Sequence, residues 1–171
     1  MISLPELAGG KVVIMKYKLT NESMINAAGK KLFRIKALVD IEEYGVKKGD
    51  LGGWIEKEDN LSQSGNAWIF GEAKVSGDAE VSGSAKVSGS AEVSGDADYA
   101  VIKGFGTEYR PTTFFRCRDG EARVTCGCFY GTIAEFREQV KRTREGKVAN
   151  EYLKIADLME YHFKEDGEIN G

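Results

Sequence analysis

The sequence predicts a mainly β protein: a short left-handed parallel β-helix of hexapeptide repeats, followed by an α+β module of a β-hairpin and two helices. The β-helix rests on a period of six in residues 61–98, which from Gln63 read QSGNAW, IFGEAK, VSGDAE, VSGSAK, VSGSAE and VSGDAD. A glycine in every unit would weaken an α-helix by about 1 kcal/mol each, whereas six residues suit one short strand and one tight corner. Three units then form a coil of about 18 residues, stacked at the ~4.8 Å spacing of paired strands.

The repeat assigns a role to each of its positions. The alanine four positions after each aliphatic residue faces inward, and the glycine accommodates the backbone of the corner. An offset of 18 residues places Lys74 beside Glu92, which we interpret as a solvated face. The aliphatic residue of each unit points inward and stacks on the residue 18 positions further on: Ile69 on Val87, Val75 on Val93, and Val81 on Tyr99.

Residues 1–60 are expected to cap the β-helix. Alternating apolar and charged residues predict strands at 15–20 and 32–41, with Ala28-Gly29 in the turn between them. The stretch 46–54, VKKGDLGGW, is a glycine-rich turn without the spacing of a phosphate-binding loop. An open coil would expose its apolar interior, so we expect four large residues to close its end: Trp54, Ile55, Leu61 and Trp68.

A β-hairpin is predicted after the repeat, on a two-residue turn at Asp119-Gly120. That turn pairs Phe115 with Val124 and sorts the side chains onto two faces. One is a core face: Phe115, Cys117, Ala122, Val124, Cys126 and Cys128. The other is a basic stripe with one aromatic residue: Phe114, Arg116, Arg118, Glu121, Arg123 and Thr125.

Two helices follow the hairpin. Thr132 and Glu135 form a capping box that opens the first helix, and Gly146 ends it. The second helix covers residues 148–163, with an apolar face along it. The chain thus divides into three parts: a cap at 1–60, the repeat at 61–103, and the hairpin-plus-helix module at 104–171.

Charge and composition exclude several classes of protein. The net charge is −3, with −4 in residues 61–100 and +4 in residues 101–147, so a general nucleic-acid binder is not expected. There is no apolar run of membrane-spanning length and no apolar core of a signal peptide. An odd count of three cysteines is typical of a reducing compartment. We therefore expect a cytoplasmic protein without a membrane partner.

The run GDLGGWIEKEDNLSQSGNAWIFGEAKV at 49–75, with FFRC…VTCGCFYGT further on, resembles a family of hexapeptide-repeat proteins found mainly in phages, prophages and bacteria. The resemblance covers roughly residues 15–163. Some members of that family are described as acyltransferases. The resemblance implies the fold and a phage or prophage origin, and it supplies no catalytic residue.

No catalytic, metal or cofactor site is expected. Acyltransferases with this repeat use a histidine as general base, and here His162 lies on a terminal helix, far from the repeat. Zinc sites usually draw on cysteine pairs separated by two to four residues, whereas Cys126 and Cys128 are separated by one, so these cysteines and His162 are not expected to bind zinc. The acyltransferase remains an alternative, as does a purely structural oligomer.

The basic stripe is the candidate binding site. Arginines on one strand face repel each other unless an anionic group meets them, and guanidinium suits phosphate or carboxylate. We expect a homo-oligomeric, non-enzymatic binding or assembly protein that acts as a host-interaction or anti-defence factor. Its partner would be a host protein or an anionic nucleotide. The candidate residues are Arg110, Phe114, Arg116, Arg118 and Arg123.

Overall fold

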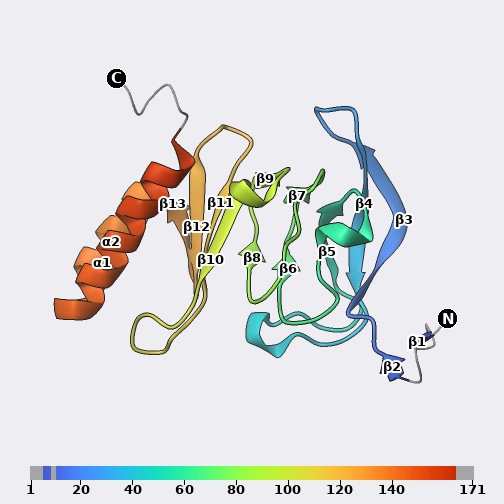
Figure 1. The fold of residues 1–171 in the computed structure, drawn as a ribbon, viewed down its shortest axis with the longest axis horizontal. Coiled ribbons are helices and arrows are strands. Elements are labelled where there is room, and N and C mark those ends of the chain that lie inside the picture. Colours follow the sequence, from blue (N-terminus) through green and yellow to red (C-terminus); the bar gives the residue numbers. More distant parts are fainter. Residues whose placement is uncertain (1–5, 9–10, 165–171) are drawn as a thin grey trace.

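The computed structural model describes residues 6–8 and 11–164, which form successive layers along the long axis of the molecule (Figure 1). An antiparallel hairpin, β3–β4, lies at one end, and the short strands of the repeat follow it. A four-stranded antiparallel sheet comes next, and two helices form the last layer. The first strands are β1 (Glu6–Ala8), β2 (Lys11–Val13), β3 (Tyr17–Ile25), β4 (Lys31–Ala37) and β5 (Leu51–Ile55). The repeat contributes β6 (Trp68–Ile69), β7 (Lys74–Val75), β8 (Lys86–Val87) and β9 (Glu92–Val93).

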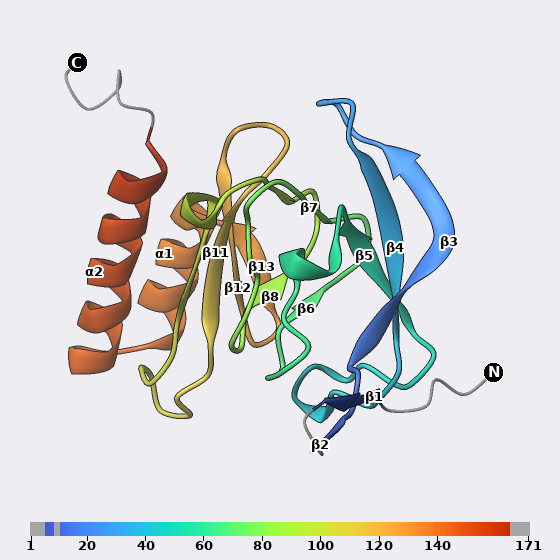
Figure 2. The same ribbon diagram turned by 45° about the vertical axis from the view of Figure 1, so that its right-hand side comes forward.

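The fold class predicted from the sequence is wrong. The chain is an α+β protein with mixed and antiparallel sheets, and its described residues form no β-helix or solenoid. The parallel strands are two residues long, and β7 and β9 complete a mixed sheet with the order β3-β4-β5-β7-β9. So few parallel pairs do not build a self-contained domain, and antiparallel layers from the same chain enclose them (Figure 2).

The register of the repeat is nevertheless confirmed at two positions. Ile69 pairs in parallel with Val87, and Val75 pairs with Val93. The inward positions are buried as expected, at 0–1% exposure. They comprise the alanines Ala67, Ala73, Ala79, Ala85 and Ala91 and the aliphatic residues Ile69, Val75, Val81, Val87 and Val93.

The sixth unit, VSGDAD, breaks the pattern. The Asp98 carboxylate accepts hydrogen bonds from the backbone N–H groups of Ser94 (2.9 Å) and Gly95 (3.2 Å) and from the Ser94 hydroxyl (3.0 Å). These bonds hold residues 96–98 in a 3₁₀ turn, η3 (Asp96–Asp98), and Ala97 becomes exposed. The predicted stacking of Val81 on Tyr99 is therefore wrong, because Tyr99 leaves the repeat and pairs antiparallel with Phe115.

The first end of the repeat is covered by the N-terminal hairpin. The Tyr17 side chain is fully buried, and its hydroxyl donates to the carbonyls of Leu61 (2.6 Å) and Glu58 (2.9 Å). The Gln63 side-chain oxygen accepts from the backbone N–H of Tyr17 at 3.2 Å. The residues expected to close this end are buried inside the stack, and the cover itself comes from β3 and β4. Those strands begin and end at residues other than the predicted 15–20 and 32–41.

The paired glycines of GDLGGW stand where backbone and side chains approach most closely. A Cβ atom at Gly53 would lie 2.5 Å from the Ala73 carbonyl oxygen and 2.5 Å from Cγ2 of Ile69. A Cβ atom at Gly52 would lie 2.6 Å from Cγ1 of Ile35. The motif thus lets β5 lie against the next rung of the repeat, and its role here is packing.

Gly53→Ala is expected to lower the free energy of unfolding by about 3 kcal/mol, because the added methyl group overpacks a site walled by backbone. Urea denaturation measures this loss. Gly95→Ala is the matched control, since no atom lies within 4 Å of a Cβ atom there and its φ is not in the left-handed region. A Gly53→Ala midpoint equal to that of Gly95→Ala would contradict the packing role.

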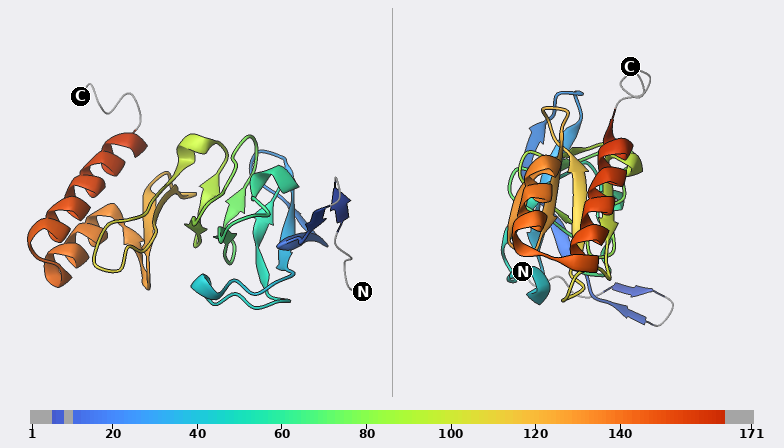
Figure 3. Two further views of the ribbon diagram at one scale, coloured as in Figure 1. Left: turned by 60° about the horizontal axis from the view of Figure 1, so that its bottom comes forward. Right: turned by 90° about the vertical axis from the view of Figure 1, so that its left-hand side faces the viewer.

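The second end of the repeat is covered by the antiparallel sheet β10-β11-β12-β13. One sheet face, with Phe115 and Cys117, packs on the repeat, and the other, with Phe114 and Val124, packs on the helices. The helices lie side by side over that outer face (Figure 3). The elements are β10 (Tyr99–Ile102), β11 (Thr112–Arg116), β12 (Ala122–Cys126), β13 (Phe129–Thr132), α1 (Ile133–Thr143) and α2 (Gly146–Phe163).

The two C-terminal helices are confirmed. The Thr132 hydroxyl accepts from the Glu135 N–H at 3.1 Å, as the capping box predicts. Gly146, expected to end the first helix, instead begins the second in the left-handed region at φ 60°. None of the helices in residues 11–164 is both long and apolar enough to cross a membrane.

The predicted hairpin register is wrong by one residue. The Cys117 N–H donates to the Glu121 carbonyl at 2.9 Å, so the loop has three residues and ends at Gly120 with φ 87°. Phe115 therefore pairs with Arg123, and Phe114 pairs with Val124. Because side chains alternate along a strand, this slip moves one whole strand to the opposite face.

Candidate functional site

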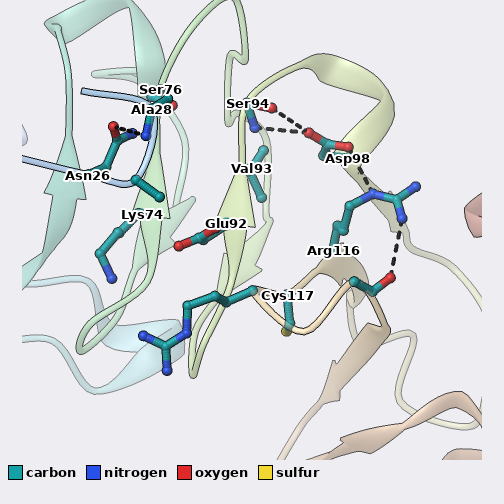
Figure 4. Close-up of a pocket in the computed structure, with 13 residues that line it drawn as sticks. Asn26, Ala28, Lys74, Ser76, Glu92, Val93, Ser94, Asp98, Arg116 and Cys117 are labelled. Atoms are coloured by element: carbon teal, nitrogen blue, oxygen red, sulfur yellow. Dashed lines mark hydrogen bonds and ion pairs between the residues drawn. The ribbon is translucent and has the colours of Figure 1, made fainter. Parts of the chain in front are cut away.

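A cleft of about 380 Å³ opens between the tips of two hairpins (Figure 4). The β3–β4 turn forms one wall with Asn26, and the β11–β12 turn forms the other with Arg116 and Arg118. The last rungs of the repeat form the floor, where Lys74 and Glu92 point into the cavity. Both turns lie at the same edge of the molecule in Figure 1, although about 90 residues of chain separate them.

Local hydrogen bonds hold the first wall. The Asn26 side-chain oxygen accepts from the backbone N–H groups of Ala28 (3.0 Å) and Lys30 (2.9 Å), and Gly29 adopts φ 81°. An asparagine that bonds to its own turn in this way favours a tight reversal. The tip of the β3–β4 hairpin therefore keeps a defined shape without help from the repeat.

The second wall is tied directly to the repeat. The Arg118 backbone N–H donates to the Ser90 carbonyl at 2.9 Å, and Ala91 forms an antiparallel bridge with Cys117. These contacts hold the hairpin turn against the last rung, so the exposed side chain of Arg118 lies at the cleft.

The structure does not assemble the predicted basic stripe. The one-residue slip places Arg116 and Arg123 on opposite faces of the sheet. The Arg123 guanidinium forms ion pairs with Asp119 (2.5 Å) and Glu121 (3.3 Å). Phe114 is fully buried against Phe136.

Of the five predicted residues, only Arg116 and Arg118 line the hairpin-tip cleft. Arg110 forms an ion pair with Glu108 and lines another cavity. The slip also separates the cysteines expected on one face, since Cys117 faces the repeat and Cys126 packs with the helices.

Arg116 acts mainly as a clasp between three elements. Its guanidinium bonds to the Asp98 carboxylate (3.1 Å) and to the carbonyls of Gly120 (3.3 Å) and Phe163 (3.4 Å). Burial opposes ionisation of Asp98, but the hydrogen bonds from Ser94 and Arg116 outweigh it and hold the pKa of Asp98 below its ordinary value. The Arg116 charge is thus neutralised within the fold.

Three charged side chains of the cleft form no ion pair. Lys74, Glu92 and Arg118 have no oppositely charged group within 4.0 Å among residues 11–164. Lys74 and Glu92 are register partners on adjacent rungs, as the repeat predicted. Their interpretation as a merely solvated face missed that a hairpin tip from each side turns that face into a cleft.

The remaining chemically active side chains lie elsewhere. His162 has Nε2 at 2.8 Å from the Ala97 carbonyl oxygen, and its ring packs on Phe163. Burial raises the pKa of the Cys117 thiol. Within the described residues, no three His, Cys, Asp or Glu side chains gather as metal ligands would.

No protein-family model matches this chain, and no curated protein matches it in sequence. The geometry and charge of the hairpin-tip cleft are therefore the basis for assigning a function.

Proposed function

We propose that this chain is a non-enzymatic binding protein whose hairpin-tip cleft receives acidic side chains of a partner protein. The observation that carries the proposal is the pair of cations, Lys74 and Arg118, that line one cavity without a carboxylate within 4.0 Å among residues 11–164. Arginine offers a rigid fork of donors to a carboxylate, and lysine adds a point charge beside it.

A protein partner fits this cleft better than a small anion. Glu92 lies among the cations, so the cleft alternates in sign and would repel a compact polyanion at its centre. A protein surface can present acidic and basic side chains in a complementary order, which fixes the register of the complex. The walls are two β-turns whose tips project from the fold, where contact with another chain is unobstructed.

The setting of this interaction is part of the proposal. The resemblance of residues 49–75 to phage and prophage hexapeptide-repeat proteins supports a host protein in the bacterial cytoplasm as the partner. Self-association has less to contribute than the sequence suggested, because the chain covers both ends of its own repeat. Assembly into homo-oligomers remains a prediction from the sequence.

Charge reversal tests the proposal. Tagged wild type, Lys74→Glu/Arg118→Glu and the control Lys147→Glu/Lys154→Glu are expressed in a bacterial host, and co-purifying proteins are quantified by mass spectrometry. We expect a partner retained by wild type and by the helix-surface control, released at high salt, and lost from the cleft variant. A partner set unchanged in the cleft variant, with its thermal unfolding also unchanged, would overturn the proposal.

A further inference from the structure

A second cavity, of about 410 Å³, lies at the opposite edge of the molecule from the hairpin-tip cleft. Its walls come from the 3₁₀ turn η1 (Glu42–Tyr44), from strand β8, and from residues on either side of the antiparallel sheet. In Figure 1 the segment 41–50, in cyan, lies at the bottom, whereas the two hairpin tips lie at the top. The two cavities are therefore separate, and the hairpin-tip proposal does not depend on this one.

Lys86 places a cation in this second cavity. Its backbone is fixed on both sides, because its N–H donates to the Thr113 hydroxyl (3.0 Å) and its carbonyl accepts from the Thr125 hydroxyl (2.8 Å). Its Nζ lies 5.8 Å from the Tyr44 ring centroid and 5.4 Å from that of Phe70. No carboxylate lies within 4.0 Å of Nζ among the residues from 11 to 164.

Arg110 brings a second cation to the same point. The Lys86 ammonium donates to the Gly127 carbonyl at the long distance of 3.5 Å. A Cβ atom at Gly127 would lie 2.8 Å from Nη1 of Arg110. The two cationic groups thus converge on Gly127, where an anion between them would relieve their repulsion.

The other wall groups leave this point unopposed. Burial raises the pKa of the Tyr44 hydroxyl, which donates to the Ser84 carbonyl and stays neutral. The Glu43 carboxylate also lines the cavity, and it accepts from the Asn66 amide at 2.7 Å. Glu108 pairs with Arg110, whose guanidinium has five N–H donors and keeps several available.

We propose that this cavity binds the phosphate group of a small molecule, held between the Lys86 ammonium and the Arg110 guanidinium. Lysine and arginine together supply the point charge and the forked donors that phosphate oxygens accept. A cavity of about 410 Å³ lies in the size range of small-molecule sites and leaves room beyond the phosphate. The source is either free phosphate or a phosphate monoester, and both share this chemistry.

Cys128 makes the proposal testable without knowing the natural ligand. Its exposed thiol lines this cavity, whereas Cys126 lines a different one. Purified protein is alkylated with neutral iodoacetamide in the presence of inorganic phosphate, AMP or adenosine, and modification at each cysteine is followed by mass spectrometry. At about ten times its Kd a bound probe would slow alkylation of Cys128 about tenfold, with Cys126 unaffected.

Protection by phosphate alone or by AMP distinguishes the two sources, and either supports the site if Lys86→Gln removes it. Lys141→Gln, on the exposed surface of α1, is the control and should retain protection. Thermal unfolding of Lys86→Gln should match wild type, because its backbone bonds are unchanged. No protection, equal protection by adenosine, or protection that persists in a folded Lys86→Gln would overturn the proposal.

Discussion

Replacing Ala91 by lysine is expected to lower the free energy of unfolding by about 4 kcal/mol or more, which is most of the stability of a typical domain. Ala91 is fully buried in the last rung, and its carbonyl accepts from the Lys74 N–H at 2.9 Å. The bridge to Cys117 closes the space above it. A long cationic side chain has neither volume nor a counter-charge there, so the C-terminal sheet would have to separate from the repeat.

The same substitution at Ala97 is the matched control. Ala97 occupies the equivalent position of the sixth unit but is exposed, and its neighbours Asp96 and Asp98 favour a cation. Ala97→Lys should change the urea midpoint by only a few tenths of a molar unit, about 0.5 kcal/mol in stability. Equal losses at the two positions would contradict the break in the repeat at Asp96.

Asp98→Asn is expected to cost about 2 kcal/mol at neutral pH, through weaker bonds to Arg116 and to the Ser94 N–H. The folded pKa of Asp98 lies below its ordinary value of 3.8, so the ionised carboxylate stabilises the fold above that pH. This contribution is lost as the pH falls through the folded pKa. The stability difference between wild type and Asp98→Asn should therefore shrink in acid.

Urea denaturation across a pH series from about 7 to about 2.5 measures this convergence. Asp78→Asn is the control, because Asp78 is an exposed residue of the repeat that forms no ion pair within residues 11–164. Its stability should follow wild type at every pH. Wild-type and Asp98→Asn curves that stay parallel into the acid range would refute the clasp formed by Arg116, Asp98 and η3.

The repeat could be interpreted from the sequence at the level of register but not of fold class. A period of six fixes which residues face inward and which pair at an offset of 18, and these depend on local geometry. What encloses the repeat depends on contacts between distant segments. Tyr17 reaching the Leu61 carbonyl and Phe115 pairing with Tyr99 leave no periodic signal.

The hairpin shows how one local choice decides a candidate site. Asp119-Gly120 is compatible with a two-residue loop and with a three-residue loop that ends at glycine, and the two differ in register by one. The Asp119 carboxylate accepts from the Glu121 N–H at 3.0 Å, and the longer loop forms. The sequence therefore predicted a basic stripe, whereas the structure neutralises Arg116 and Arg123 separately.

The residues that form the two cavities were visible in the sequence but could not be grouped. Lys74 and Glu92 were expected to be neighbours, and the missing information was that the tips of β3–β4 and β11–β12 flank them. Lys86 and Arg110 lie 24 positions apart in chain segments of different kinds. Their convergence on Gly127 depends on how the sheet packs on the repeat.

The covered ends of the repeat bear on how such a chain could change in length. Both outer layers are docked on fixed faces of the rungs between them, so an insertion of one six-residue unit would turn the C-terminal sheet by one corner relative to β3–β4. An insertion of 18 residues would restore the pairing offset seen between Ile69 and Val87 and keep every face aligned. Viable length variants should therefore differ by whole rungs, each widening the distance between the two hairpin tips by about 4.8 Å.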